Sequence, residues 1–554
     1  MRKSILPLQM KMGNSILRKV IAAVALVSFG GLALSSDAAD FETQRREMLD
    51  RVGPFIYNTD GCDMYYYPCN KPVTPEAFKA LRLDFARRTN VRTVSYCPIS
   101  GGFGFFTVPG VGEFNDRMQA QGEDVHQVYP KGAKDIRHFN AASTFAKKFG
   151  TDAIQMTLDW CRENGRQMFI SIRFNDTHDS HPSYGHFLFP PFKKAHPECL
   201  MGTKERPPKC CRWTAVNFAE PLVRERMRTF VRQFFEKYDM DGLEIDMFRH
   251  VQLFKSVADG GVASEAEREL MTELMADIRR IAEECGRKRG RPILLSIRTP
   301  DSVGYCRAVG IDLERWFERK LVDIWTATGY FQLEQWPTTV AFARRHGVRC
   351  YASIDESRIP GAARAGKRPI IYGREALSCY RARYAAAMAA GCDGVSLFNL
   401  EYRRLTNFAQ DDLHDLAGLS KRYFATERGA GGYAPETWLT DGGRFDRMPR
   451  IDPGFARTLE PGRPYAFELM IAEDVAAAAA KGRAPTVRVL ALSGKGESVV
   501  VTLNGHELPA AGTEEGASAF AVDPGWLRNG LNAFSVVAAA RSTLHDFAVK
   551  VDYR

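Results

Sequence analysis

The strongest constraint on the fold is an alternation between short strand-like runs and longer amphipathic stretches across residues 53–399. The runs are rich in β-branched and aromatic residues, which favours buried strands. The eight runs are Gly53–Asn58, Val91–Cys97, Gln167–Phe174, Gly242–Met247, Ile293–Thr299, Val322–Thr326, Val348–Ile354 and Gly394–Asn399. Eight such units predict a closed (β/α)8 barrel over residues 40–428. A doubly wound open sheet is the alternative, but no GxGxxG motif follows the first run.

The N-terminal residues 1–39 have the pattern of a secretory signal peptide. A basic segment ends in Arg18-Lys19, an apolar run of 15 residues covers Val20–Leu34, and small residues follow. The apolar run is short for a membrane crossing, which takes about 20 residues. We therefore expect a secreted or periplasmic protein with no stable membrane insertion after cleavage. An uncleaved anchor is the alternative.

The C-terminal region predicts a second, smaller domain. Residues 429–454 are rich in Gly, Pro and Asp and are typical of a linker. Residues 455–554 contain short strand-like runs with the turn signals Asn504-Gly505 and Asn529-Gly530, which predict a β-sandwich of the jelly-roll kind. This domain is expected to pack against the barrel or, alternatively, to bind glycan.

The charge and the cysteines narrow the function classes. The formal charge of +10 falls to +6 without residues 1–39, which hold five Lys/Arg and one Asp. The remaining charge permits an anionic glycan, and the Lys/Arg runs lack the aromatic repeat of a nucleic-acid module. Cys62 with Cys69, and Cys199 with Cys210 or Cys211, are candidate disulfides, and zinc at the last three is a weaker alternative. The cysteines in apolar patterns, expected as buried thiols, are Cys97, Cys161, Cys285, Cys350, Cys379 and Cys392.

Strand parity predicts which side chains enter the barrel. Side chains alternate along a strand, so Leu243, Ile245 and Met247 should face the helices while Glu244 and Asp246 point inward. The same rule turns inward Ser171, Arg173, Asn175, Ser296 and Arg298. Glu244 is then expected between Arg173 and Arg298, which would keep it ionised with a depressed pKa.

Carboxyl groups at the ends of two strands suggest acid/base chemistry. Asp246 lies at the end of the fourth strand, and Asp355 and Glu356 follow the seventh. Two carboxyl groups facing each other across a barrel mouth are what glycoside hydrolysis requires. We therefore expect Asp246 to be catalytic, with Asp355 or Glu356 as its partner. A structural role for the partner, as a capping or salt-bridging acid, is the alternative.

Other residues after the strands predict a site for a polyhydroxylated ligand. Amides and carboxylates beside aromatic rings suit a sugar, which has hydroxyl edges and an apolar face. The candidate substrate-binding residues are Asn58, Asp60, Arg173, Asn175, Asp176, His178, Glu244, Arg298, Trp325 and Asn399. The run from Asn175 to His181 could instead bind a metal through His178 and His181, although it has no fixed-spacing signature. No cofactor motif is present, and none is expected.

Three segments together carry a resemblance to a known family. They are Trp213-Thr-Ala-Val-Asn-Phe-Ala-Glu-Pro221, the run Tyr238-Asp-Met-Asp-Gly-Leu-Glu-Ile-Asp246, and Arg173-Phe-Asn-Asp176 with His178. Over residues 50–425 the chain resembles bacterial glycosyl-hydrolase-like family 10 barrel proteins. The resemblance implies a secreted glycosidase-like barrel and points to Asp246. It departs from the family at Met247, where a second acidic residue often follows the aspartate.

The sequence thus predicts a secreted glycoside hydrolase that cleaves a poly- or oligosaccharide with paired carboxylates. Two alternatives stay open: a glycan-binding barrel without turnover, and a metal-dependent hydrolase.

Overall fold

The structure is a computed structural model of the chain. It describes residues 40–61, 67–68, 71–98, 126–128, 136–138, 141–180, 189–355, 370–399, 416, 418–427, 435–452, 454–494 and 498–553. The expected signal segment 1–39 and the candidate residue Glu356 lie outside the described residues.

Eight parallel strands close into the expected barrel. Their order around it is β1-β11-β10-β9-β8-β7-β6-β3, so each strand pairs with its neighbours in the chain and β11 closes onto β1. The strands are β1 (Phe55–Asp60), β3 (Thr93–Cys97), β6 (Gln167–Arg173), β7 (Gly242–Asp246), β8 (Leu294–Thr299), β9 (Ile324–Ala327), β10 (Arg349–Ser353) and β11 (Gly394–Phe398). This is a TIM barrel, and the (β/α)8 prediction is confirmed.

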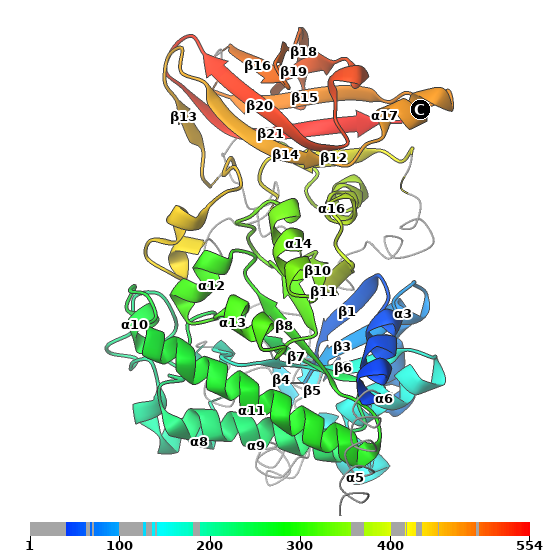
Figure 1. Cartoon of the computed structure of the whole chain (residues 1–554), viewed down its shortest axis with the longest axis vertical. Coiled ribbons are helices and arrows are strands. Elements are labelled where there is room, and N and C mark those ends of the chain that lie inside the picture. Colours follow the sequence, from blue (N-terminus) through cyan, green and yellow to red (C-terminus); the bar gives the residue numbers. More distant parts are fainter. Residues whose placement is uncertain are drawn as a thin grey trace, which may run out of the picture.

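Helices surround the strands (Figure 1). They include α2 (Pro75–Arg82), α5 (Ala141–Phe149), α6 (Ala153–Glu163), α9 (Pro221–Lys237), α11 (Glu265–Arg289), α14 (Trp336–Arg345) and α16 (Leu377–Ala389). Local sequence sets their ends: α11 begins at a capping box of Ser264 with Glu267 and ends at Gly290, whose φ of 73° suits glycine. A helix over residues 40–51 covers the end of the barrel where the strands begin. There Met48 and Val52 pack against Phe169 and Tyr351.

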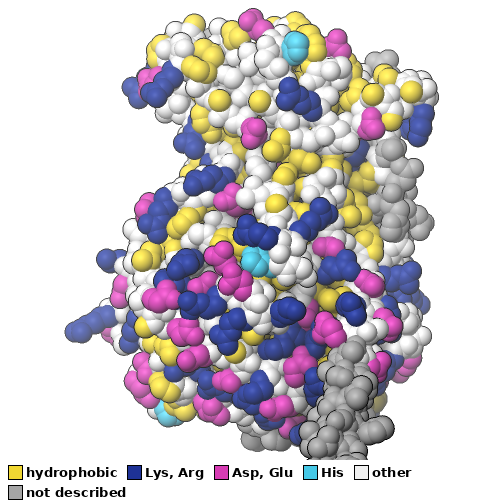
Figure 2. Space-filling model, viewed as in Figure 1, with side chains coloured by type: hydrophobic (Ala, Val, Ile, Leu, Met, Phe, Trp, Pro, Cys, Tyr) yellow, Lys and Arg dark blue, Asp and Glu magenta, His cyan; other side chains and the backbone are white. Residues whose placement is uncertain are grey.

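Charges of both signs are interspersed on the helix surface in view, with no large patch of one sign (Figure 2). Many of these charges pair between helices, as Arg228 of α9 does with Asp277 of α11 at 2.7 Å. Of the described helices, none is long and apolar enough to cross a membrane.

The barrel interior has three tiers of inward side chains. The lowest is apolar and includes Ile56, Phe169, Leu294, Ile324 and Tyr351. We call the middle tier the hydroxyl layer. It consists of Asn58, Ser95, Ser171, Glu244, Ser296, Thr326, Ser353 and Ser396. The upper tier, at the C-terminal ends of the strands, is called the mouth and includes Asp60, Cys97, Arg173, Asp246, Arg298, Asp355 and Phe398. Contacts between non-adjacent strands, such as Asn58 of β1 with Glu244 of β7, show that these side chains point into the barrel.

Two antiparallel sheets follow the barrel, as expected for a β-sandwich. One sheet has the order β12-β21-β15-β19-β18, with β13 also paired to β21, and the other has β14-β20-β16-β17. Their strands are β12 (Lys421–Phe424), β13 (Arg457–Leu459), β14 (Tyr465–Ile471), β15 (Thr486–Ser493), β16 (Val499–Leu503), β17 (His506–Glu507), β18 (Ala510–Glu514), β19 (Ala517–Val522), β20 (Gly530–Ala538) and β21 (Ser542–Asp552). A small sheet, β2 (Tyr67–Pro68) with β5 (Ile136–His138) and β4 (His126–Val128), lies apart from both.

The boundary between the two parts differs from the expectation in two ways. Strand β12 joins the C-terminal sheet from within the range assigned to the barrel, because it pairs with β21. Residues 435–452 of the expected linker pack onto the barrel: Trp438 lies in an aromatic cluster with Phe248 and Phe331, and its carbonyl accepts from Gln252. The Gly- and Pro-rich composition correctly predicts backbone without long helices or strands. It does not reveal that this backbone packs against the barrel.

The described cysteines form no disulfide with one another, and all but Cys211 are buried. The expected buried thiols are therefore confirmed, and the structure contains no disulfide between Cys199 and Cys210 or Cys211. Cys62 and Cys69 lie outside the described residues.

Candidate active site at the mouth of the barrel

Asp246 ends strand β7 and points into the mouth, as parity predicts. Its Oδ1 atom accepts the backbone N–H groups of Phe248 at 2.9 Å and Arg249 at 3.0 Å. Its Oδ2 atom lies 3.2 Å from Nη1 of Arg298 and 3.9 Å from Nε of Arg173. The carboxylate is 2% exposed and fixed in one orientation by the turn that follows the strand.

Asp355 follows strand β10 and meets the same arginine. Its Oδ2 lies 2.5 Å from Nη2 of Arg298, and its Oδ1 accepts from the Ser353 hydroxyl at 2.6 Å. Because one planar guanidinium holds both carboxylates, the bonded oxygens of Asp246 and Asp355 lie at most about 8 Å apart. The structure thus brings together the two aspartates that the sequence paired, while Glu356 lies outside the described residues.

A second group of charges lies beside this pair, nearer to solvent. Arg173 forms ion pairs with Asp60 and with Asp176, the latter at 3.1 Å. Asn399 donates to Asp60 at 2.8 Å. Burial would raise the pKa of Asp60, but Arg173 and the Asn399 amide hold it below its usual value. Burial would also raise the pKa of Asp176. The hydrogen bond from His178 and the charge of Arg173 outweigh burial and hold this pKa well below its usual range.

His178 connects Asp176 to a residue that the sequence reasoning missed. Its Nδ1 lies 2.6 Å from Asp176, and its Nε2 lies 3.0 Å from Nη2 of Arg249. A guanidinium only donates, so Nε2 accepts and Nδ1 carries the proton. The Arg249 side chain also donates to the Tyr330 hydroxyl. The position of Arg249, three residues after the strand-end Asp246, is the sequence signal that would have found it.

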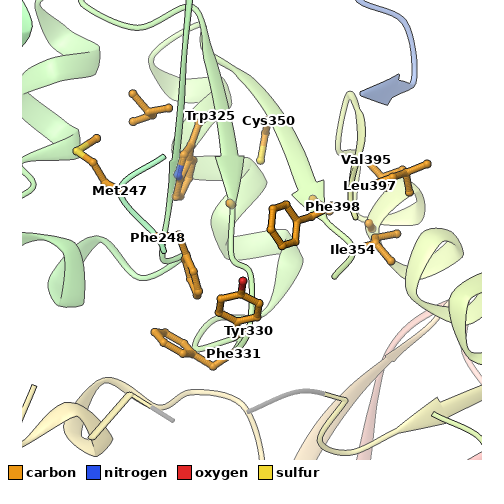
Figure 3. Close-up of a cluster of buried hydrophobic side chains, with 14 of the residues drawn as sticks. Met247, Phe248, Trp325, Tyr330, Phe331, Cys350, Ile354, Val395, Leu397 and Phe398 are labelled. Atoms are coloured by element: carbon orange, nitrogen blue, oxygen red, sulfur yellow. The ribbon is translucent and has the colours of Figure 1, made fainter. Parts of the chain in front are cut away.

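Aromatic rings line the other side of the mouth. The Arg298 guanidinium lies 4.6 Å from the Phe398 ring centre and 5.6 Å from that of Phe248. Figure 3 shows Phe248, Tyr330 and Phe398 close together. The ring centre of Tyr330 lies 5.8 Å from that of Phe248 and 6.3 Å from that of Phe398. Low-dielectric surroundings strengthen the ion pairs that Arg298 makes, and its pKa is raised although burial alone would lower it.

The prediction for Glu244 is wrong in its electrostatics. In register, Glu244 lies opposite Ser171 and Ser296, whereas Arg173 and Arg298 lie opposite Asp246. The arginines therefore pair at the mouth, and Glu244 instead accepts from Asn58 and, at 2.8 Å, from Ser171. Burial and then the charge of Asp246 raise the pKa of Glu244 to about 7, against a smaller opposing effect of Arg298. Glu244 is a buried acid below the mouth and does not face a ligand there.

Three further candidates for substrate binding also have other roles. Trp325 lies on the outer face of β9, where its ring packs on Phe317 and Phe342 and its Nε1 donates to Thr299. Asn58 lies in the hydroxyl layer beneath the mouth. Asn175 uses its amide on the backbone of Val216 and Gln252, which fixes the loop after β6. These corrections leave Asp60, Arg173, Asp176, His178, Arg298 and Asn399 at the mouth.

The alternative of a metal site at His178 and His181 finds no set of ligands among the described residues. Within the described ranges, no group of three or more His, Cys, Asp or Glu side chains is placed to hold an ion. His178 already has Arg249 on one ring nitrogen and Asp176 on the other, and His181 lies outside the described residues.

The chain has a weak likeness to several solved structures. The chain is similar to α-L-fucosidase isoenzyme 2 from Paenibacillus thiaminolyticus, with 12% identity, TM-score 0.37, and 63% of this chain and 46% of that chain covered. It is similar to the PgaB (BpsB) glycoside hydrolase domain from Bordetella bronchiseptica, with 12% identity, TM-score 0.37, and 65% and 99% covered. A maltogenic α-amylase, AmyB from Thermotoga neapolitana, gives 12% identity, TM-score 0.33, and 86% and 98% covered. The chain thus spans less than half the length of the fucosidase. No family model and no curated protein sequence matches it.

Proposed function

We propose that the protein is a glycoside hydrolase with Asp246 and Asp355 at its reaction centre. The observation that carries this proposal is the pair of strand-end carboxylates held by the single guanidinium of Arg298. Hydrolysis of a glycosidic bond uses two carboxyl groups about 5 Å apart with retention, or about 6.5 to 9.5 Å apart with inversion. The bound of about 8 Å set by Arg298 includes both arrangements.

The surroundings suit this chemistry. Backbone N–H groups fix Asp246 in one orientation, which is the preorganisation that a nucleophile or a stabiliser of developing positive charge needs. Solvent reaches this part of the mouth at the side chains of His178, 24% exposed, and Asp60, 14% exposed. A sugar entering there would meet these two side chains together with Arg249. The finer parts of the proposal are a resemblance to glycosyl-hydrolase-like family 10, export directed by residues 1–39, and a poly- or oligosaccharide substrate that can be anionic.

A second candidate, a glycan-binding barrel without turnover, is favoured by the bridge itself. Arg298 occupies the space between the two carboxylates, and Asp246 accepts from three donors. A hydrolase must move this guanidinium away from one carboxyl group, because that group has to carry the proton that it gives to the leaving-group oxygen. A binding protein would use the same bridge as a rigid floor.

A product-release screen over neutral and anionic polysaccharides separates the two candidates. The variants are Asp246→Asn and Asp355→Asn, with Asp50→Asn as control, because Asp50 is an exposed aspartate in the helix at the opposite end of the barrel. The hydrolase predicts release by the wild type and the control, and loss of at least 100-fold in each mouth variant. Equal release by all four proteins would refute the assignment. Saturable sugar binding without release would favour the binding protein.

A further inference from the structure

The hydroxyl layer differs in chemistry from the usual filling of such a barrel. Bulky branched side chains normally dominate the interior of a (β/α)8 barrel. Here the middle tier has six hydroxyl-bearing side chains, one amide and one carboxyl, which are Ser95, Ser171, Ser296, Thr326, Ser353, Ser396, Asn58 and Glu244. Each of them is at most 1% exposed. Serine is small, so the five serines of this tier fill less of the interior than valine or leucine would.

Several oxygen atoms of this tier have no protein hydrogen-bond partner within the described part of the chain. They are Asn58 Oδ1, Glu244 Oε2, Ser296 Oγ, Thr326 Oγ1 and Ser396 Oγ, and they come from five different strands. Buried polar atoms are nearly always satisfied, by protein or by ordered water. Five such atoms on the inward side chains of one tier indicate bound molecules that both donate and accept hydrogen bonds.

Glu244 is the ionisable member of the tier. Its described hydrogen bonds come from the neutral donors Asn58, Ser171 and Ser95, and it has no ion pair among the described residues. The charged groups that act on it are Asp246, on the same strand, and Arg298 on β8, while the faces toward β1, β3 and β6 present Asn58, Ser95 and Ser171. Burial and then the neighbouring Asp246 carboxyl group favour the neutral form of Glu244.

We propose that the hydroxyl layer is a hydrated chamber under the active site, in which bound water molecules join Glu244 to the hydroxyl groups and Glu244 stores a proton. Water fits the donor set because it can donate to Asn58 Oδ1 and exchange roles with each hydroxyl. Glu244 protonated at Oε2 donates into the same network. Glu244 holds this proton more tightly when Asp246 is charged. A change of charge at the mouth therefore changes the affinity of Glu244 for its proton. This role is independent of turnover and goes beyond the proposed hydrolase reaction.

Infrared spectroscopy of the full chain tests the stored proton. We expect a carboxylic-acid C=O band in the wild type that titrates near neutral pH and is absent in Glu244→Gln. Glu163→Gln, which changes an exposed glutamate, should retain the band. In Asp246→Asn the midpoint should move to lower pH by about one unit, because the like charge is removed. Identical spectra for the wild type and Glu244→Gln, or an unmoved midpoint in Asp246→Asn, would overturn the stored proton.

A high-resolution crystal structure and one isosteric variant test the water. Ordered density should lie within hydrogen-bonding distance of Ser296, Thr326 and Ser396. Thr326→Val should lower the unfolding midpoint, because it removes a hydroxyl that water satisfies, whereas a dry site predicts a gain in stability. An empty chamber, or a single peak with short bonds to six oxygens as for a cation, would overturn the proposal. None of these measurements needs a substrate, so the chamber and the hydrolase assignment can fail separately.

Discussion

Replacing Glu244 by Gln should make the protein more stable above neutral pH. Glutamine keeps the shape of the side chain and can still accept from Asn58 and Ser171, but it cannot ionise. The pKa of Glu244 rises from 4.5 to about 7 on folding. Each pKa unit is worth about 1.4 kcal/mol, so ionising Glu244 costs the folded wild type about 3 kcal/mol.

The sign follows from proton linkage. Because the pKa is higher in the folded state, the folded chain binds the proton more tightly than the unfolded chain does. The favourable contribution is fully present below about pH 4.5 and is lost progressively as the pH rises to about 7. The variant therefore gains stability relative to the wild type across this interval and keeps the gain at higher pH.

Urea unfolding at pH 5 and pH 8 measures this difference. The gap between the unfolding free energies of Glu244→Gln and the wild type should grow by about 2 to 3 kcal/mol from the lower to the higher pH. Glu163→Gln, at an exposed position 62% accessible to solvent, serves as the control and should show no such growth. A gap that stays constant with pH would refute the account of Glu244 as a buried neutral acid.

Three further predictions follow from the packing. Arg298→Met should lower the unfolding free energy by about 3 to 5 kcal/mol in urea titrations, because it leaves the Asp355 carboxylate buried without its ion-pair partner and leaves Asp246 with only the longer contact to Arg173; an unchanged midpoint would argue against the bridge. Arg374→Met should cost a similar amount by the same assay, because Arg374 forms a buried two-bond ion pair with Asp546 of β21. Retention of the wild-type midpoint there would contradict that contact between the barrel and the C-terminal sheet. Trp325→Ala should cost about 3 to 5 kcal/mol as a core cavity, while sugar binding measured by titration calorimetry at a temperature where the variant is folded should stay at the wild-type value.

The inward and outward faces of the barrel strands follow from the sequence alone. Alternation along Gly242–Asp246 placed Leu243 and Ile245 against the helices and Glu244 and Asp246 inside, as the structure shows. This works because the period of two is a property of each strand by itself.

Which inward side chains meet was decided by the tertiary structure. Parity cannot say that Arg173 and Arg298 lie level with Asp246, because that depends on the register between strands and on the stagger of the closed barrel. The contact of Asn58 with Glu244 crosses the barrel between strands far apart in the chain. The raised pKa of Glu244 depends on that depth and burial, which no stretch of sequence contains. The sequence thus determined the set of side chains inside the barrel, and barrel closure decided their partners, because partners across a barrel are fixed only when all eight strands are in place.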